Sequence, residues 1–201
     1  PTFATSLRSA ETVVTEASME SLSGKLLVAS PRLNDPNFSR TVVLLVEHDH
    51  GGALGLVLNR PGNQSLDSMW DDLVDGACPH DLAVMVGGPL EGPVLALHAD
   101  SALAERGIVP GVFLAMRKDL IVSLVVDGSR PLRVFAGYSG WGAGQLESEV
   151  AADDWAIAEA TSELVFGDTH SMWQRVTTQI ADTKLARALR IKHVPAEPWH
   201  N

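Results

Sequence analysis

The chain has 201 residues and a formal net charge of −10, from 25 acidic and 15 basic side chains. A field of this sign repels nucleic acid unless the basic residues gather on one face, so direct nucleic-acid binding is disfavoured. No apolar run approaches the roughly 18 residues of a membrane span, which argues against membrane contact. A single cysteine excludes an internal disulfide and is consistent with the reducing cytoplasm, where we expect the protein to act.

Two apolar runs, residues 42–46 and 54–58, predict a buried β-hairpin with its turn at residues 49–52. We expect the rest of the chain to be organised around this hairpin. A uniform register implies three cross-strand pairs: His48 with Ala53, Val46 with Gly55, and Val42 with Asn59.

The remaining patterns predict alternating short strands and helices. Strands are expected at residues 26–29, 82–86, 93–98, 112–116 and 132–136. Helices are expected at residues 65–73, from residue 145, and from Asp168 or Thr169 through Ile180, with one or two helical turns at residues 101–107. Residues 120–126 and 155–160 fit either a strand or a helix. Hairpins mixed with strand–helix alternation are typical of an α+β protein.

The domain organisation predicted from composition is simple. Residues 1–20 are rich in Ser, Thr, Glu and Ala without a clear period, and we interpret them as a flexible arm. No linker-like stretch interrupts residues 21–194, so we expect a single domain there. Residues 195–201 form a tail with no apolar pattern.

Polar side chains gather at both ends of the predicted hairpin. Glu47 and His48 could form an acid/base pair or bind a metal, but neighbours on a strand point to opposite faces, and no further ligand lies nearby. We therefore interpret His48 as an exposed turn residue and predict no metal site. Arg40 and Asn59 lie at the other end, with Arg40 about 23 Å from Glu47. That end is the better candidate for contact with a ligand or partner.

A glycine-rich stretch, residues 137–144 (GYSGWGAG), follows a predicted strand and precedes a predicted helix. Its spacing matches neither GxGxxG nor a phosphate-binding loop, and Glu147 already places negative charge in the first turn of the helix. Trp141 occupies the last glycine position of a GxSxG elbow, so Ser139 is not predicted to be a nucleophile. A pocket for a neutral or cationic group, lined by Tyr138 and Trp141, remains plausible.

Two alternative functions stay open. One is a hydrolase-type enzyme that uses His48 or His98 with Glu47, although His98 ends an apolar strand and is more typical of a core histidine. Catalysis by Cys78, which has His80 nearby in sequence, is disfavoured because nothing local activates the thiol. The other alternative is direct DNA binding through a basic helix end formed by Lys184, Arg187, Arg190, Lys192 and His193.

Several motifs in combination resemble the AlgH/YqgE family. They are GKLLVASP at residues 24–31, DPxFxR at 35–40, Glu47–His48, GALGLVLNRP at 52–61, GGP at 87–89, Leu97–His98 and GYSGWGAGQLE at 137–147. The resemblance covers roughly residues 22–180 and implies an α+β fold with a bent or bifurcated, mostly antiparallel sheet that forms a pseudo-barrel flanked by helices. Family members are commonly labelled transcriptional regulators, and the resemblance implies neither a catalytic residue nor a cofactor.

The sequence therefore favours a non-enzymatic binding or regulatory protein that contacts an unknown protein partner or a small ligand. Regulation through a partner fits the charge better than direct DNA contact. We predict no catalytic residue, metal or cofactor. The predicted binding residues are Arg40, Asn59, Gly87, Gly88, Pro89, Tyr138, Trp141, Gln145 and Glu147.

Overall fold

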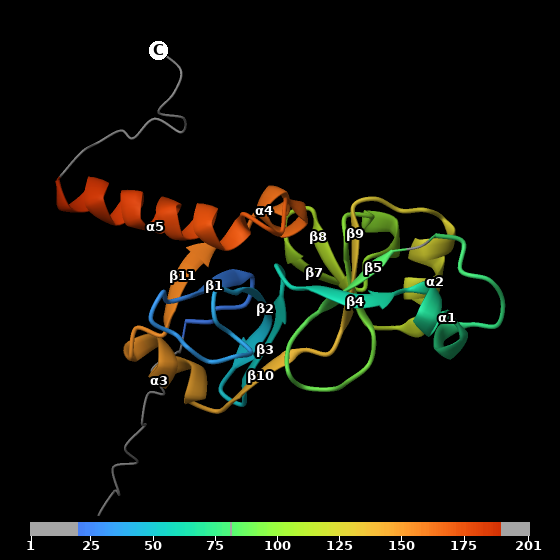
Figure 1. The fold of residues 1–201 in the computed structure, drawn as a ribbon, viewed down its shortest axis with the longest axis horizontal. Helices are drawn as coiled ribbons and strands as arrows, with labels where there is room; N and C mark the ends of the chain where they lie inside the picture. Colours follow the sequence, from blue (N-terminus) through green and yellow to red (C-terminus); the bar gives the residue numbers. More distant parts are fainter. Residues whose placement is uncertain (1–19, 81, 190–201) are drawn as a thin grey trace, which may run out of the picture.

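The computed structural model describes residues 20–80 and 82–189 (Figure 1). Within these residues the chain forms two β-sheets with helices packed around them, which confirms the predicted α+β class. The predicted arm, except for Glu20, and the predicted tail lie outside the described residues. So do Arg190, Lys192 and His193, three of the five residues of the proposed basic helix end.

The first sheet contains the predicted hairpin at its centre. Its five strands are antiparallel, in the order β10-β3-β2-β1-β11. Their bounds are β1 Lys25–Ala29, β2 Val42–Asp49, β3 Gly52–Val57, β10 Ser139–Gly142 and β11 Trp155–Glu159. Alternate residues of β2 and β3 pack into two different buried clusters, so the apolar runs of both strands are buried on both faces.

The register of the hairpin agrees with the prediction next to the turn and differs from it further along the strands. His48 lies opposite Ala53 as expected, but the register shifts between Leu45 and Glu47, so that Leu45 lies opposite Gly55. Val46 is the additional residue of a β-bulge, which moves every earlier pair by one position. The predicted pairs of Val46 with Gly55 and of Val42 with Asn59 are therefore wrong.

The second sheet has six strands in the order β4-β5-β9-β6-β8-β7, with β5 and β9 parallel and the other neighbours antiparallel. Their bounds are β4 Pro61–Ser65, β5 Ala83–Val86, β6 Leu95–His98, β7 Arg106–Val109, β8 Val112–Ala115 and β9 Leu132–Ala136. The edge strands β4 and β7 were not predicted, because each is irregular in register and contains glycine or proline.

The helices cover the faces and ends of the two sheets (Figure 1). Their bounds are α1 Asp67–Leu73, α2 Lys118–Val126, α3 Gln145–Ala151, α4 Ser162–Phe166 and α5 Met172–Ala188, with a 3₁₀ turn at Ser101–Leu103. Before α5, the Asp168 carboxylate accepts hydrogen bonds from the hydroxyl and the N–H of Ser171. These bonds, with one from the His170 N–H, lower the pKa of Asp168 to about 2. The N-cap of α5 is Ser171 and not the predicted Asp168 or Thr169, so Asp168 stabilises the turn that leads into the helix.

One buried cluster joins the two sheets. It contains Leu44 and Leu56 of the first sheet, Leu97 and Phe135 of the second, and Val176 of α5. Leu44, Leu56, Leu97 and Phe135 have no exposed surface. Both sheets therefore share a core on the side that α4 and α5 cover, as expected for a bifurcated sheet.

The sheets diverge where two backbone segments cross. Gly87 donates its N–H to the Ala136 carbonyl (2.9 Å) and accepts from the Val57 N–H (2.9 Å), while Leu90 and Tyr138 exchange two hydrogen bonds (3.0 Å each). A Cβ at Gly87 would lie 2.2 Å from the Gly137 carbonyl oxygen. The predicted binding residues Gly87 and Gly88 thus allow this crossing, which gives both glycines a structural role.

Arg133 on β9 links the sheets to the segment between α4 and α5. Its guanidinium donates to the Leu58 carbonyl (2.9 Å) and to the Gly167 carbonyl. Burial lowers its pKa, and nearby Asp168 partly offsets this. We expect Arg133→Met to lower the free energy of unfolding by about 2–4 kcal/mol, because two carbonyls lose a charged donor.

Urea unfolding followed by tryptophan fluorescence measures this effect. The control is Arg117→Met, since the Arg117 side chain is 62% exposed and pairs with an exposed Asp119. Its expected cost is about 0.5 kcal/mol or less. Equal costs for the two variants would contradict the structural role of Arg133.

Candidate functional site

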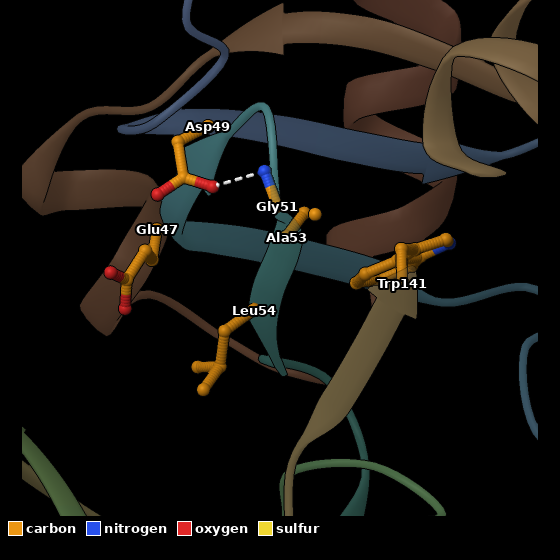
Figure 2. A pocket seen from close by; sticks show the side chains of 7 residues that line it. Glu47, Asp49, Gly51, Ala53, Leu54 and Trp141 are labelled. Carbon is orange, nitrogen blue, oxygen red and sulfur yellow. Dashed lines mark hydrogen bonds between the residues drawn. The ribbon is translucent and has the colours of Figure 1, made fainter. Parts of the chain in front are cut away.

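Three of the sequence motifs meet at the turn of the β2–β3 hairpin (Figure 2). They come from the end of β2, the start of β3, and the segment from β10 into α3, which lies next to β3. An open depression of about 300 Å³ occupies this position. We call its lining the tip surface; its residues are Glu47, Asp49, Gly51, Gly52, Ala53, Leu54 and Trp141.

The turn itself is held by short-range contacts. The Asp49 carboxylate accepts a hydrogen bond from the Gly51 N–H at 2.7 Å (Figure 2). Gly52 has φ +134°, and a Cβ there would lie 2.1 Å from the Trp141 carbonyl oxygen. A residue with a side chain would push β10 away from the hairpin, so the glycine fixes how closely Trp141 approaches the turn.

His48 is buried beneath this surface, with its side chain only 1% exposed. The Leu22 N–H donates to Nδ1 at 2.9 Å, and Nε2 lies 2.8 Å from the Glu147 carboxylate. Nδ1 must therefore be the acceptor, and Nε2 carries the proton that is donated to Glu147. The prediction of an exposed His48 is wrong, because the imidazole joins β2 to α3 and to the segment before β1.

Glu147 is the other half of this contact, 99 residues further along the chain. A hydrogen bond from its own backbone N–H lowers its pKa most, followed by the hydrogen bond from His48. The helix N-terminus favours the same charged state. Glu147 is therefore a carboxylate held against His48, on the face of β2 opposite Glu47.

Glu47 points away from His48, as the alternation of a strand predicts. Its carboxylate lies 3.4 Å from a guanidinium nitrogen of Arg106, and its side chain is 51% exposed. Neither histidine of the enzymatic alternative, His48 or His98, forms a hydrogen bond with Glu47 in the described part of the chain. The enzymatic alternative depends on a histidine paired with Glu47, whereas the structure pairs His48 with Glu147.

Trp141 lines the depression on the β10 side, and its ring packs in the buried cluster on the other face of the sheet, so that the residue is only 5% exposed. Its indole N–H donates to Glu149 at 2.8 Å, as does that of Trp155, and its ring stacks on Phe38 with centroids 6.0 Å apart. Gln145 orders the same carboxylate through a 2.9 Å hydrogen bond. Sequence reasoning missed Glu149, whose position between two indole donors depends on tertiary packing.

The Arg40 and Asn59 end of the hairpin has a structural role. The Asn59 amide donates to the Arg40 carbonyl and accepts from the Val42 N–H, both at 2.9 Å. The guanidinium of Arg40 lies 5.8 Å from the ring centroid of Trp173. Asn59 therefore joins the two strands at the open end of the hairpin. The candidate site lies at the other end, at the turn.

The nine predicted binding residues thus fall in three places. Arg40 and Asn59 close the hairpin. Gly87, Gly88, Pro89 and Tyr138 lie in or beside the crossing of the sheets. Trp141 lines the tip surface, and Gln145 and Glu147 follow it in α3.

His98 is fully buried on β6, and neither ring nitrogen has a hydrogen-bond partner among the described residues. Burial lowers its pKa below 6.5, and Asp100 only partly offsets this. The folded state therefore binds a proton at His98 less readily than the unfolded chain does. The stability gained by keeping His98 neutral is present above about pH 6.5 and is lost as the pH falls below that value.

We expect His98→Leu to remove that pH-dependent contribution. Near pH 7 the free energy of unfolding of the variant should equal that of the wild type or exceed it by about 1 kcal/mol, because a buried unpaired imidazole is replaced by an apolar side chain. Urea unfolding from pH 5 to 8 measures the difference. A constant difference between the two proteins over this range would contradict the account of His98.

No group of three or more His, Cys, Asp or Glu side chains among the described residues is arranged to hold a metal ion. No helix among these residues is long and apolar enough to cross a membrane.

The fold and the site define a class of α+β protein, with two sheets joined at a glycine crossing and an acidic depression at a hairpin turn. The AlgH-like family model matches residues 26–184. A UPF0301 protein from Myxococcus xanthus is 40% identical over 160 residues, covering 77% of this chain and 88% of the relative. The chain belongs to the AlgH-like family.

Solved structures show the same fold. The solution structure of the AlgH protein from Pseudomonas aeruginosa superposes with a TM-score of 0.68 at 26% identity, covering 90% of this chain and 99% of that one. The crystal structure of DIP2367 from Corynebacterium diphtheriae gives 0.65 at 22% identity, over 81% of this chain and 88% of that one. This similarity confirms the fold that the resemblance implied.

Proposed function

We propose that this protein is a non-enzymatic binding protein that contacts a partner protein through the tip surface. The observation that carries the proposal is the combination of acidic side chains and an apolar floor in one open depression. Glu47 and Asp49 supply the carboxylates, while Leu54, which lies opposite Glu47 on the adjacent strand, supplies the floor. A lysine or arginine side chain matches this arrangement, because its apolar stem can cover the floor while its charged head meets the carboxylates.

Charge supports a basic partner segment. The chain carries −10 overall, and Glu147, bonded to His48, adds a carboxylate on the other face of β2. Opposite charge on a partner would speed association and fix its orientation more than it would raise affinity. The depression is also open and shallow, as is usual for protein contacts rather than for enclosed small-molecule sites.

Catalysis has less support at this site. A general base needs a nitrogen that can accept a proton from substrate, and both nitrogens of His48 are occupied by Leu22 and Glu147. We therefore propose that any regulatory effect on transcription arises from contact with a partner protein and not from binding to DNA. We also propose a cytoplasmic location, in keeping with the single free cysteine.

A titration with a short arginine- and lysine-rich peptide tests the proposal, with amide chemical shifts as the measurement. We expect shifts concentrated at residues 47–54 and 141, with an affinity that falls as salt is added. The double variant Glu47→Gln with Asp49→Asn should weaken binding about tenfold, the equivalent of about 1.4 kcal/mol. The matched control neutralises Asp71 and Asp72, exposed residues of α1. Equal weakening by both double variants would overturn the assignment.

A further inference from the structure

Strand β11 forms one edge of the first sheet and is paired only with β1 among the described residues. The hydrogen bond from the Ser30 N–H to the Asp154 carbonyl (2.8 Å) fixes which backbone groups face β1. Because this register continues along the strand, Ala156 and Ala158 face β1, and Trp155, Ile157 and Glu159 direct their N–H and C=O groups outward. The outward groups have no partner in the described part of the chain.

The other three sheet edges contain features that discourage pairing. Strand β4 begins with Pro61 and is irregular in register, and β7 is irregular between Gly107 and Val109. Strand β10 has the sequence SGWG, and the Gly142 N–H is already bonded to Gln145. Bulges, prolines and short glycine-rich strands are the usual protection of sheet edges.

Strand β11 has none of these protections. Its sequence, WAIAE, contains no proline or glycine, and its register with β1 is regular over all five residues. Its one charged side chain, Glu159, is paired with Lys25 of the adjacent strand at 2.7 Å. Ile157 at the centre of the strand is 40% exposed. An exposed apolar residue at the centre of a regular edge is characteristic of a pairing surface.

We propose that β11 pairs antiparallel with β11 of a second copy of this chain, about a two-fold axis at Ile157. The arrangement is self-complementary: Ile157 lies opposite Ile157 of the partner subunit, and Trp155 lies opposite Glu159 of the partner subunit. No like charges therefore meet across the axis. Every outward N–H and C=O of Trp155, Ile157 and Glu159 gains a backbone partner.

The same two-fold axis joins two five-stranded sheets into one continuous sheet of ten. Helix α5 packs against β1 and β11 (Figure 1). Because the two-fold axis is perpendicular to the sheet, both copies of α5 would lie on the same face of the joined sheet. The tip surface remains free, because β11 and β10 are opposite edges of the first sheet. The dimer therefore presents two tip surfaces to partners.

Sedimentation of the full chain over a wide range of protein concentration, together with amide hydrogen exchange, tests this proposal. The wild type should be a dimer in which the Ile157 amide exchanges slowly. Ile157→Lys should be a folded monomer with fast exchange at residues 155, 157 and 159, because two lysines would face each other at the axis. The control Val126→Lys, at a 55% exposed position on α2, should remain a dimer.

The remaining outcomes each overturn the proposal. A wild type that is monomeric at every concentration excludes the pairing, whether or not the Ile157 amide is protected. A dimer that survives Ile157→Lys, or whose Ile157 amide exchanges fast, associates through another surface. A second variant, Ile157→Pro, separates pairing from folding, since it removes only an outward N–H and leaves the hydrogen bonds to β1 intact.

Discussion

Replacing Gly88 with alanine is expected to lower the free energy of unfolding by more than about 4 kcal/mol, the range of exceptional single substitutions. A Cβ at this position would lie 2.3 Å from the carbonyl carbon of Tyr138 and 2.4 Å from the Ser139 nitrogen. These are backbone atoms, and the crossing segments are joined by hydrogen bonds on both sides of the contact. The chain cannot relax without separating the two sheets.

Urea unfolding monitored by circular dichroism measures this effect. The control is Gly107→Ala on β7, where the nearest atom to the added Cβ is 3.9 Å away in the Phe113 ring. Its expected change is about 0.5 kcal/mol or less. If Gly88→Ala were as stable as this control, the glycine crossing would not be the joint between the sheets.

Replacing His48 with alanine is expected to cost about 3 kcal/mol of stability. The substitution leaves the Leu22 N–H without its acceptor and Glu147 without its donor, and it empties a buried volume. The resonances of the tip surface should shift as well, because His48 joins the hairpin to α3. Glu147 should contribute less to this loss of stability than Leu22 does, since the Glu147 side chain is 37% exposed and its carboxylate can be rehydrated.

The matched control is His50→Ala, two residues along the same turn and exposed to solvent. We expect its stability to stay within about 0.5 kcal/mol of the wild type. Unfolding curves of the two variants at pH 7 provide the comparison. Two equal, small effects would contradict the buried role of His48.

The central hairpin could be predicted from sequence because its signal is local. Two apolar runs separated by a polar turn specify paired, buried strands, and residues 42–46 and 54–57 are such runs. The bulge at Val46 could not be predicted, because the extra residue is as apolar as the four residues that precede it. Its position depends on how β2 meets β1 and β3 at the same time.

Residues 120–126 show where local propensity loses to packing. Their β-branched content favours a strand, yet they form most of α2. Ile121, Leu124 and Val125 are buried at helical spacing, so burial against the second sheet outweighs the intrinsic preference. Residues 155–159 were equally ambiguous and form β11, because the edge of β1 was available for pairing.

The candidate site was only partly predictable. Of the predicted binding residues, Trp141 lines the depression and Glu147 contacts His48, and their part in binding stays a prediction. The burial of His48 was missed because its partner is 99 residues away, and no local pattern records such a contact. Gly87 and Gly88 were predicted to bind a ligand or partner, and the structure shows that they also permit a close backbone approach, which requires the same residue type.

The central claim is that His48 holds the tip surface in place and is not a proton-transfer group. Nitrogen chemical shifts of the ¹⁵N-labelled imidazole at neutral pH test it most directly. The account predicts a proton on Nε2, visible in slow exchange because it is bonded to Glu147, and an unprotonated Nδ1 that accepts from Leu22. A His48 ring that exchanges rapidly between tautomers, or one with an unprotonated Nε2, would contradict the account and restore His48 as a candidate base.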